Sequence, residues 1–200
     1  MRLRPSGASG LLVSNIQSFA DYQRHEAWTW EHQALIRARV IAGSDLLAQR
    51  FQAIRREVLG RQRDPDKLLD DIVTMRGRMR RELARSGADV FDIKQDKGGL
   101  VDIEFIVQYY VLRWADRHPE LLQWTDNIRL LETLARCRIL TESDCKILSD
   151  AYRAYRACIH RLTLQDQPAR LGDDRFDTSR HAVSRIWEDL FEGRADRENS

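Results

Sequence analysis

Apolar residues recur at steps of three and four along most of the chain, which is the spacing of one face of an α-helix. A capping pair at Ser18 and Asp21 predicts a first helix that runs through Trp28 towards Ile41, and Gly43 ends it. The other amphipathic helices are predicted to begin at Ser44, Asp64, Thr125, Thr141 and Asp177. The pattern therefore predicts an all-α fold.

The segment Val101–Leu112 differs from the others because its apolar residues cover every side of a helical wheel. A helix that is apolar all round is buried. Asp102, Glu104 and Gln108 interrupt this apolar surface, and buried polar groups require hydrogen-bond partners. We therefore expect these three side chains to be paired.

The N-terminal residues do not follow the helical pattern. Residues 2–10 are small, glycine-rich and basic, and the apolar residues 11–13 follow them, which indicates a strand, a loop and a second short strand. Two short strands do not form a stable sheet alone.

We therefore divide the chain into three parts. Residues 1–17 are expected to be the edge of a second domain, residues 18–192 an α-helical domain, and residues 193–200 a disordered tail. The expected fold is a bundle of about six to seven helices with a short N-terminal strand-loop.

The composition is that of a globular protein with a core. The chain has 200 residues, of which 42% are hydrophobic, and 33 basic side chains nearly balance 31 acidic ones. A net charge of +2 argues against a general nucleic-acid coat. No apolar run reaches membrane-span length and no signal peptide is evident, so a cytoplasmic location without a membrane partner is expected.

The three cysteines have neither an even count nor CxxC spacing. They therefore predict no disulfide framework and no zinc site.

The first candidate site surrounds the start of the apolar segment. Gly98 and Gly99 permit positive φ or a close backbone approach, and Asp102 follows in the first helical turn. In a functional interpretation, these residues and Glu104 form the wall of a nucleotide cleft. In the alternative interpretation, Asp102 caps its own helix and Glu104 pairs with an arginine.

The second candidate site is the segment 27–39. Glu31 falls on the apolar side of the predicted helix, whereas Arg37 and Arg39 point elsewhere and could contact phosphates or acidic partners. The alternative is a core tryptophan pair with a buried Glu–Arg bridge. His32 has no second histidine at ligand spacing, so no metal site is expected there.

Five arginines lie close together in or near the predicted helix that follows Asp64, namely Arg76, Arg78, Arg80, Arg81 and Arg85. No aromatic residues interleave with them, so they do not favour nucleic-acid binding. We interpret them as a solvated face or a contact with another domain.

The N-terminal loop contains Arg2, Arg4, Ser6 and Gly7. Guanidinium, hydroxyl and backbone N–H groups together can bind a phosphate. The loop is therefore a candidate nucleotide-binding element.

Four segments together resemble a known family. They are RLRPSGASGLLVS, AWTWEHQALIRAR, GGLVDIEFIVQYYVL and WTDNIRLLETLA. In order and spacing they resemble the C-terminal adenylyltransferase half of glutamate–ammonia-ligase adenylyltransferase, from residue 2 to about residue 165. The words TWEHQAL and GGLVDIEF favour the transferring half over the adenylyl-removing half.

The resemblance implies a nucleotidyltransferase core, similar to that of DNA polymerase beta, followed by a helical domain that PII uridylyltransferases share. In that family, carboxylates of the core bind Mg²⁺ and orient ATP, and AMP is transferred to a tyrosine of glutamine synthetase. These carboxylates are expected upstream of RLRPSG, so no metal ligand can be assigned to a residue of this chain. The chain alone is expected to be inactive and to bind no cofactor.

What can be carried over is a supporting role. Arg2, Arg4, Ser6 and Gly7 are assigned to nucleotide binding in the longer enzyme. The residues assigned to support of the cleft are Glu31, Arg37, Arg39, Gly98, Gly99, Asp102 and Glu104. The expected partners are glutamine synthetase, the PII signalling protein and the upstream domains. The alternative function is a non-catalytic helical module that binds glutamine synthetase or PII.

Overall fold

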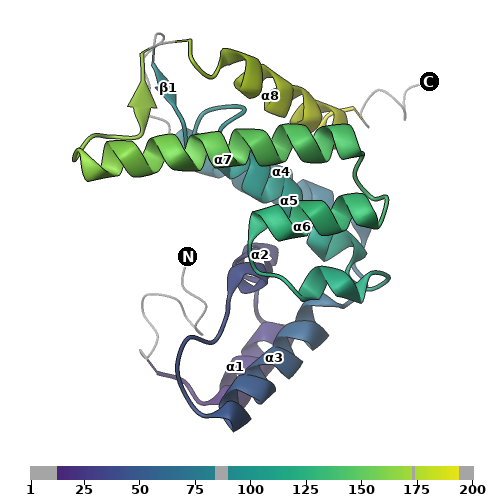
Figure 1. Ribbon diagram of the computed structural model, residues 1–200. Coiled ribbons are helices and arrows are strands. Elements are labelled where there is room, and N and C mark those ends of the chain that lie inside the picture. Colours follow the sequence, from purple (N-terminus) through teal and green to yellow (C-terminus); the bar gives the residue numbers. More distant parts are fainter. Residues whose placement is uncertain (1–12, 84–89, 173, 194–200) are drawn as a thin grey trace. The chain divides into compact units, whose positions relative to one another are not determined.

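The structure is a computed structural model that describes residues 13–83, 90–172 and 174–193 (Figure 1). The all-α prediction is confirmed, because these residues form eight α-helices, one short 3-10 helix and two strands of two residues each. The helices are α1 Ile16–His25, α2 Thr29–Arg37, α3 Asp45–Leu59, α4 Pro65–Leu83, α5 Leu100–Trp114, η2 Pro119–Leu122, α6 Asn127–Arg136, α7 Glu142–Leu164 and α8 Asp177–Phe191. The expectations for residues 1–12 and 194–200 lie outside the described residues.

The chain separates into two compact units. Unit 1 comprises the described residues of Met1–Ile72 and of Gln108–Thr133, and unit 2 those of Val73–Val107 and of Leu134–Ser200. The division does not coincide with the predicted boundary at residue 17, which stays a prediction.

In unit 1, α3 packs against both α1 and α2 (Figure 1). Asn15 caps α1, and the predicted cap Ser44 is confirmed for α3. The rings of Phe19 and Phe51 stack with their centroids 5.8 Å apart between the two helices. These contacts place the apolar sides of α1 and α3 against one another.

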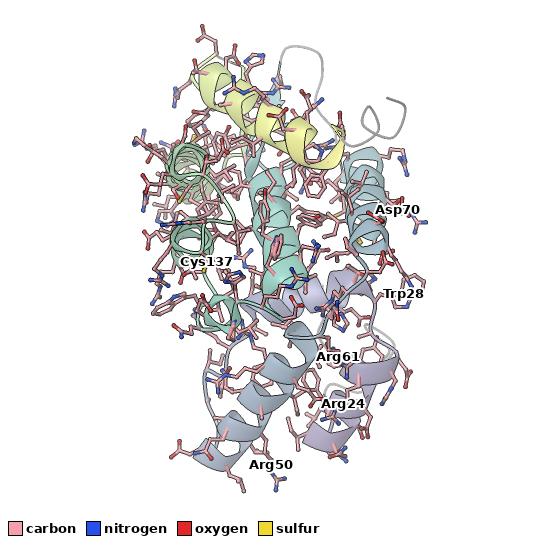
Figure 2. The ribbon with its side chains drawn as sticks, turned by 90° about the vertical axis from the view of Figure 1, so that its right-hand side faces the viewer. Arg24, Trp28, Arg50, Arg61, Asp70 and Cys137 are labelled. Carbon is pink, nitrogen blue, oxygen red and sulfur yellow. The ribbon has the colours of Figure 1, made fainter. Side chains whose placement is uncertain are left out.

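An ion-pair group also joins α1 to α3. Arg24 of α1 donates two hydrogen bonds, of 2.8 and 2.7 Å, to the carboxylate of Glu57 on α3. Arg61 donates a hydrogen bond of 2.8 Å to the backbone oxygen of Arg24, and both residues are labelled in Figure 2. The group is partly exposed, so it contributes less than the apolar contacts do.

The single helix predicted from Ser18 towards Ile41 is wrong, because the chain forms two helices there. The side chain of Glu31 accepts the Trp28 N–H at 3.0 Å, and this cap starts α2 at Thr29. The backbone leaves helical geometry again at Ala38, and Ile41 is 86% exposed. The apolar spacing hid both breaks because it continues across them.

In unit 2, α7 packs against α8. The strands β1 Phe91–Asp92 and β2 Arg170–Leu171 pair antiparallel, with Phe91 opposite Leu171. Tyr155 is completely buried, and its ring meets those of Phe91 and Phe176 edge-on, at 6.1 and 5.0 Å. Tyr155 thus lies at the centre of an aromatic cluster between the β1–β2 strand pair and the helices.

The predicted burial of residues 101–112 is confirmed. Ile103, Ile106 and Val107 of α5 are completely buried. The helix predicted to begin at Thr125 begins instead at Asn127, because the Asp126 carboxylate accepts the Arg129 N–H at 3.0 Å and so caps it.

The cysteines, which were expected to form no disulfide, are all free thiols. In the part of the chain that the structure describes, no helix combines the length and the apolar character that crossing a bilayer requires.

Candidate functional site

Asp102 is the centre of a buried polar cluster in unit 2. Its side chain has no exposed surface. One carboxylate oxygen accepts a hydrogen bond of 2.6 Å from Nε of Arg76. The other accepts hydrogen bonds of 2.7 Å from Nη2 of Arg80 and of 2.8 Å from the Gly98 N–H. The carboxylate is thus bound by two guanidinium groups and one backbone amide.

Both arginines come from one face of α4, where residues four apart are neighbours. Arg76 also donates a hydrogen bond of 2.7 Å to the Gln95 backbone oxygen, and its guanidinium lies over the ring of Phe105. Burial lowers the pKa of Arg76, and the carboxylate of Asp102 acts in the opposite direction. The prediction of a solvated arginine face is therefore wrong for Arg76, which is completely buried.

Gly98 and Gly99 bring backbone close to backbone. Gly98 has φ +77°, and a Cβ at this position would lie 2.2 Å from the backbone oxygen of Arg180 on α8. A Cβ at Gly99 would lie 2.7 Å from the Ile93 oxygen. The Tyr155 hydroxyl donates 3.0 Å to the Gly98 oxygen. The two glycines thus permit close packing within unit 2.

The structure therefore brings Gly98, Gly99 and Asp102 together in the interior of unit 2. The alternative interpretation that Asp102 caps α5 is met only in part, because Asp102 accepts the Gly98 N–H, which lies two residues before the helix begins. Glu104 is half-buried and also has an interaction partner. Their role in supporting a nucleotide cleft stays a prediction.

Glu31 is a second buried carboxylate, in unit 1, and is 1% exposed. Its carboxylate accepts a hydrogen bond of 2.6 Å from the Tyr22 hydroxyl and one of 3.0 Å from the Trp28 N–H. The hydrogen bond to Glu31 raises the pKa of Tyr22 to about 12. The alternative of a Glu–Arg bridge beside a tryptophan core is wrong, because Glu31 pairs with a phenol and Trp28 is 71% exposed.

The other predicted residues of unit 1 lie on its surface. Arg37 and Arg39 are both exposed, and Arg37 has an interaction partner. Arg39 lines an apolar groove with Ile41 and Phe51. The remaining predicted residues, Arg2, Arg4, Ser6 and Gly7, lie outside the described part of the chain.

The sequence interpretation missed Arg55, which is 1% exposed in unit 1. Its guanidinium donates to the backbone oxygens of Leu35 at 3.1 Å, Ile36 at 2.6 Å and Leu122 at 2.7 Å. Burial lowers its pKa to about 10, so it stays protonated at neutral pH. The signal was present, because Arg55 is four residues after Phe51 and so lies on the apolar side of α3.

Arg63 is a second arginine that the interpretation missed. Its guanidinium donates hydrogen bonds of 2.8 Å to the Val58 oxygen and of 3.0 Å to the Leu59 oxygen, at the C-terminal end of α3. Burial lowers its pKa to about 10, and the negative charge of Asp116 opposes the shift. A cation at this end of a helix compensates the free carbonyl groups.

Asp102 and Glu31 do not fit a magnesium site. Mg²⁺ requires carboxylate oxygens that are free to coordinate it and usually keeps several waters. Asp102 is surrounded by two cations, and Glu31 is bound by Tyr22 and by the Trp28 amide. No step of a metal-assisted reaction is therefore assigned to either residue.

Comparison with known proteins gives matches along most of the chain. A family model described as glutamate-ammonia ligase adenylyltransferase matches residues 1–54, and one described as GlnD PII-uridylyltransferase matches residues 73–188. The second match begins at the residue where unit 2 begins.

Three similar proteins are bifunctional glutamine synthetase adenylyltransferase/adenylyl-removing enzymes. The protein of Nitrosococcus oceani is 53% identical over 191 residues, which are 96% of this chain and 20% of that protein. The protein of Pseudomonas aeruginosa is 50% identical over 202 residues, 95% of this chain and 21% of that protein. The protein of Pseudomonas syringae pv. tomato is 51% identical over 199 residues, 94% of this chain and 20% of that protein. The chain spans about a fifth of the length of these relatives.

Proposed function

The chain belongs to the family described as GlnD PII-uridylyltransferase, and from this premise we propose that it is the helical domain of a longer glutamine synthetase adenylyltransferase. The longer enzyme transfers AMP from ATP to a tyrosine of glutamine synthetase. The observation that carries the proposal is the identity of 50–53% to three bifunctional enzymes over at least 94% of this chain.

In this proposal the described carboxylates are structural supports. Asp102 ties α4 to the turn that precedes α5, and Glu31 starts α2. Mg²⁺ and ATP are bound by the nucleotidyltransferase core of the longer enzyme, and the chain alone transfers no AMP. We also propose a cytoplasmic location and no nucleic-acid partner, in keeping with the net charge of +2.

The test is a transfer assay with glutamine synthetase and ATP labelled in the α-phosphate. We expect the longer enzyme to label glutamine synthetase and the 200-residue chain to leave it unlabelled. Labelling by the chain alone would contradict the assignment of the catalytic groups to another domain. Equal transfer by the longer enzyme and its Asp102→Ala variant would show that transfer does not depend on the structural support that Asp102 provides.

A second candidate function is a non-catalytic module that binds glutamine synthetase or PII. The match of a PII-uridylyltransferase model to residues 73–188 favours PII as its partner. Titration of the chain with purified PII and, separately, with glutamine synthetase distinguishes the partners. Saturable binding of either protein by the chain supports this function, and no binding of either contradicts it.

A further inference from the structure

Three of the exposed large apolar side chains of unit 1, Val40, Ile41 and Leu47, line one groove. The groove has a volume of about 620 Å³ and lies between α1, α3 and the segment 39–43. Its lining residues are Ser14, Asn15, Ile16, Phe19, Arg39, Val40, Ile41, Ala42, Gly43, Leu47, Ala48 and Phe51. Val13 and Leu46, which are 82% and 59% exposed, adjoin lining residues in the sequence.

This amount of exposed apolar surface needs an explanation. Ile41 is 86% exposed and Leu47 50%, although both side chains are favoured in a core. Contiguous apolar patches on a soluble protein mark interaction surfaces. The groove is therefore a candidate docking surface.

Charge limits what the groove can accept. Arg39 is the single charged residue among the groove's lining residues, and it makes no hydrogen bond or ion pair with any described residue. An occupant that covers the groove removes part of this guanidinium from water, which is costly without a counter-charge. The complementary occupant is therefore an apolar surface that carries a carboxylate.

Two observations indicate that the occupant is covalently connected to the groove. The described residues begin at Val13, and the next three residues, Ser14, Asn15 and Ile16, line the groove directly. The twelve residues before Val13 span at most about 43 Å, so any domain joined to them is held near the groove at high effective concentration.

The second observation is that the groove lies within one family match. The adenylyltransferase model matches residues 1–54 as one stretch, which includes every residue that lines the groove. The PII-uridylyltransferase model covers none of the lining residues. The groove thus belongs to the part of the chain that matches adenylyltransferases.

We propose that this groove binds the nucleotidyltransferase domain of the longer enzyme, through an apolar surface that places a carboxylate against Arg39. The inference rests on the proposed function, which makes the chain a domain of that enzyme. It assigns a function to Arg39 that differs from a role beneath the nucleotide cleft: Arg39 pairs with the neighbouring domain.

Hydrogen exchange measures coverage of the groove directly. The backbone N–H groups of residues 39–43 make no backbone hydrogen bonds within the described residues, so they exchange quickly unless another surface covers them. We expect them to exchange at least about tenfold more slowly in the longer enzyme than in the 200-residue chain at a concentration where it is monomeric. Equal exchange in the two proteins would overturn the proposal.

Two pairs of variants of the longer enzyme separate the groove from the rest of the surface. Ile41→Asp is expected to abolish the slow exchange, whereas Leu164→Asp, a matched change at a side chain 75% exposed on α7, leaves it unchanged. Arg39→Glu is expected to weaken it, whereas Arg50→Glu, at an exposed arginine of α3 that does not line the groove, does not (Figure 2). Loss in both members of a pair would contradict a specific interface.

A second copy of the chain is the competing occupant. Sedimentation would show it as a dimer of the 200-residue chain that Ile41→Asp dissociates, together with no added protection in the longer enzyme. Transfer of AMP, measured on the same preparations, keeps the two proposals apart. Protection without transfer would overturn the proposed function alone, and transfer without protection would overturn the groove assignment alone.

Discussion

The two units bury arginine in different ways. In unit 1, the guanidinium of Arg55 is surrounded by backbone oxygens, with the Trp124 oxygen at 3.2 Å as a further acceptor and no carboxylate among its described partners. In unit 2, Arg76 is equally buried but pairs with the carboxylate of Asp102. One unit compensates the charge with dipoles and the other with an opposite charge.

The difference shows what each arginine stabilises. Arg55 binds the Ile36 oxygen in the last turn of α2 and the oxygen of Leu122, the last residue of η2. Carbonyl groups at the end of a helix lack N–H partners within that helix. Arg55 joins the ends of two helices that are far apart in sequence. Arg76 and Arg80 instead make a carboxylate tolerable in the interior, and that carboxylate holds the Gly98 turn. Removing a partner should therefore be most costly in unit 2, where it leaves a charge uncompensated.

The largest expected effect is that of Asp102→Ala. It leaves the buried guanidinium of Arg76 without its carboxylate and frees the Gly98 N–H. We expect the free energy of unfolding of the chain to fall by about 3–5 kcal/mol. Urea denaturation followed by circular dichroism measures it. A loss below about 1 kcal/mol would place Asp102 among weak surface pairs and remove the contrast between the units.

Gly98→Ala tests the turn that Asp102 holds. The added Cβ would lie 2.2 Å from a backbone oxygen of α8 at a φ of +77°, so both strain and overlap oppose it. We expect a loss of about 2–3 kcal/mol in the free energy of unfolding. Gly43→Ala is the control, because Gly43 has φ +128° with nothing within 4 Å of the Cβ position. Equal losses would show that the close approach to Arg180 does not matter.

Arg55→Met tests the arginine of unit 1 whose charge is compensated by backbone oxygens. It removes the hydrogen bonds to the Leu35, Ile36 and Leu122 oxygens without leaving a buried charge. We expect a loss of about 2 kcal/mol, the cost of buried carbonyl groups without donors. The neighbouring exposed Arg56→Met should change the free energy of unfolding by less than about 0.5 kcal/mol. A loss for Arg55→Met as large as that for Asp102→Ala would show that dipoles and opposite charge are equivalent here.

Tyr22→Phe gives the smallest expected effect, about 1 kcal/mol at neutral pH, because it removes one hydrogen bond to Glu31. The pKa of Tyr22 is raised in the folded chain from 10.0 to about 12. The stabilising contribution of its neutral form is therefore complete below pH 10 and is lost as the pH rises from 10 to 12. The difference in unfolding free energy between the chain and Tyr22→Phe should decline over that interval. A constant difference would contradict the Tyr22–Glu31 hydrogen bond.

Much of the fold could be predicted because helical periodicity and capping residues are local signals. Ser44, Asp177 and the apolar segment 101–112 illustrate this, and all three predictions are confirmed. The break before α2 could not be predicted in this way, because its N-cap residue is Trp28, a residue type that is not typical of this position. The paired strands β1 and β2 were missed because each has two residues, too few to show alternation, and they are far apart in the sequence.

The candidate site was predictable only in part. The need of Asp102 for a partner followed from its place in an apolar helix, but the identity of that partner depends on packing between segments 26 residues apart. The arginines of α4 looked alike in the sequence, although Arg76 is buried and Arg78 is exposed. The place of Arg55 on the apolar side of α3 signalled its burial, but its carbonyl partners could not be predicted, because backbone oxygens leave no complementary acid in the sequence.

The central claim is that Asp102 and Glu31 are internal supports and that Mg²⁺ and ATP bind elsewhere in the longer enzyme. Calorimetric titration of the 200-residue chain with ATP and Mg²⁺ tests it most directly. We expect no saturable heat of binding. Binding with a micromolar dissociation constant, lost in Asp102→Ala or in a Glu31→Gln variant that remains folded, would contradict it.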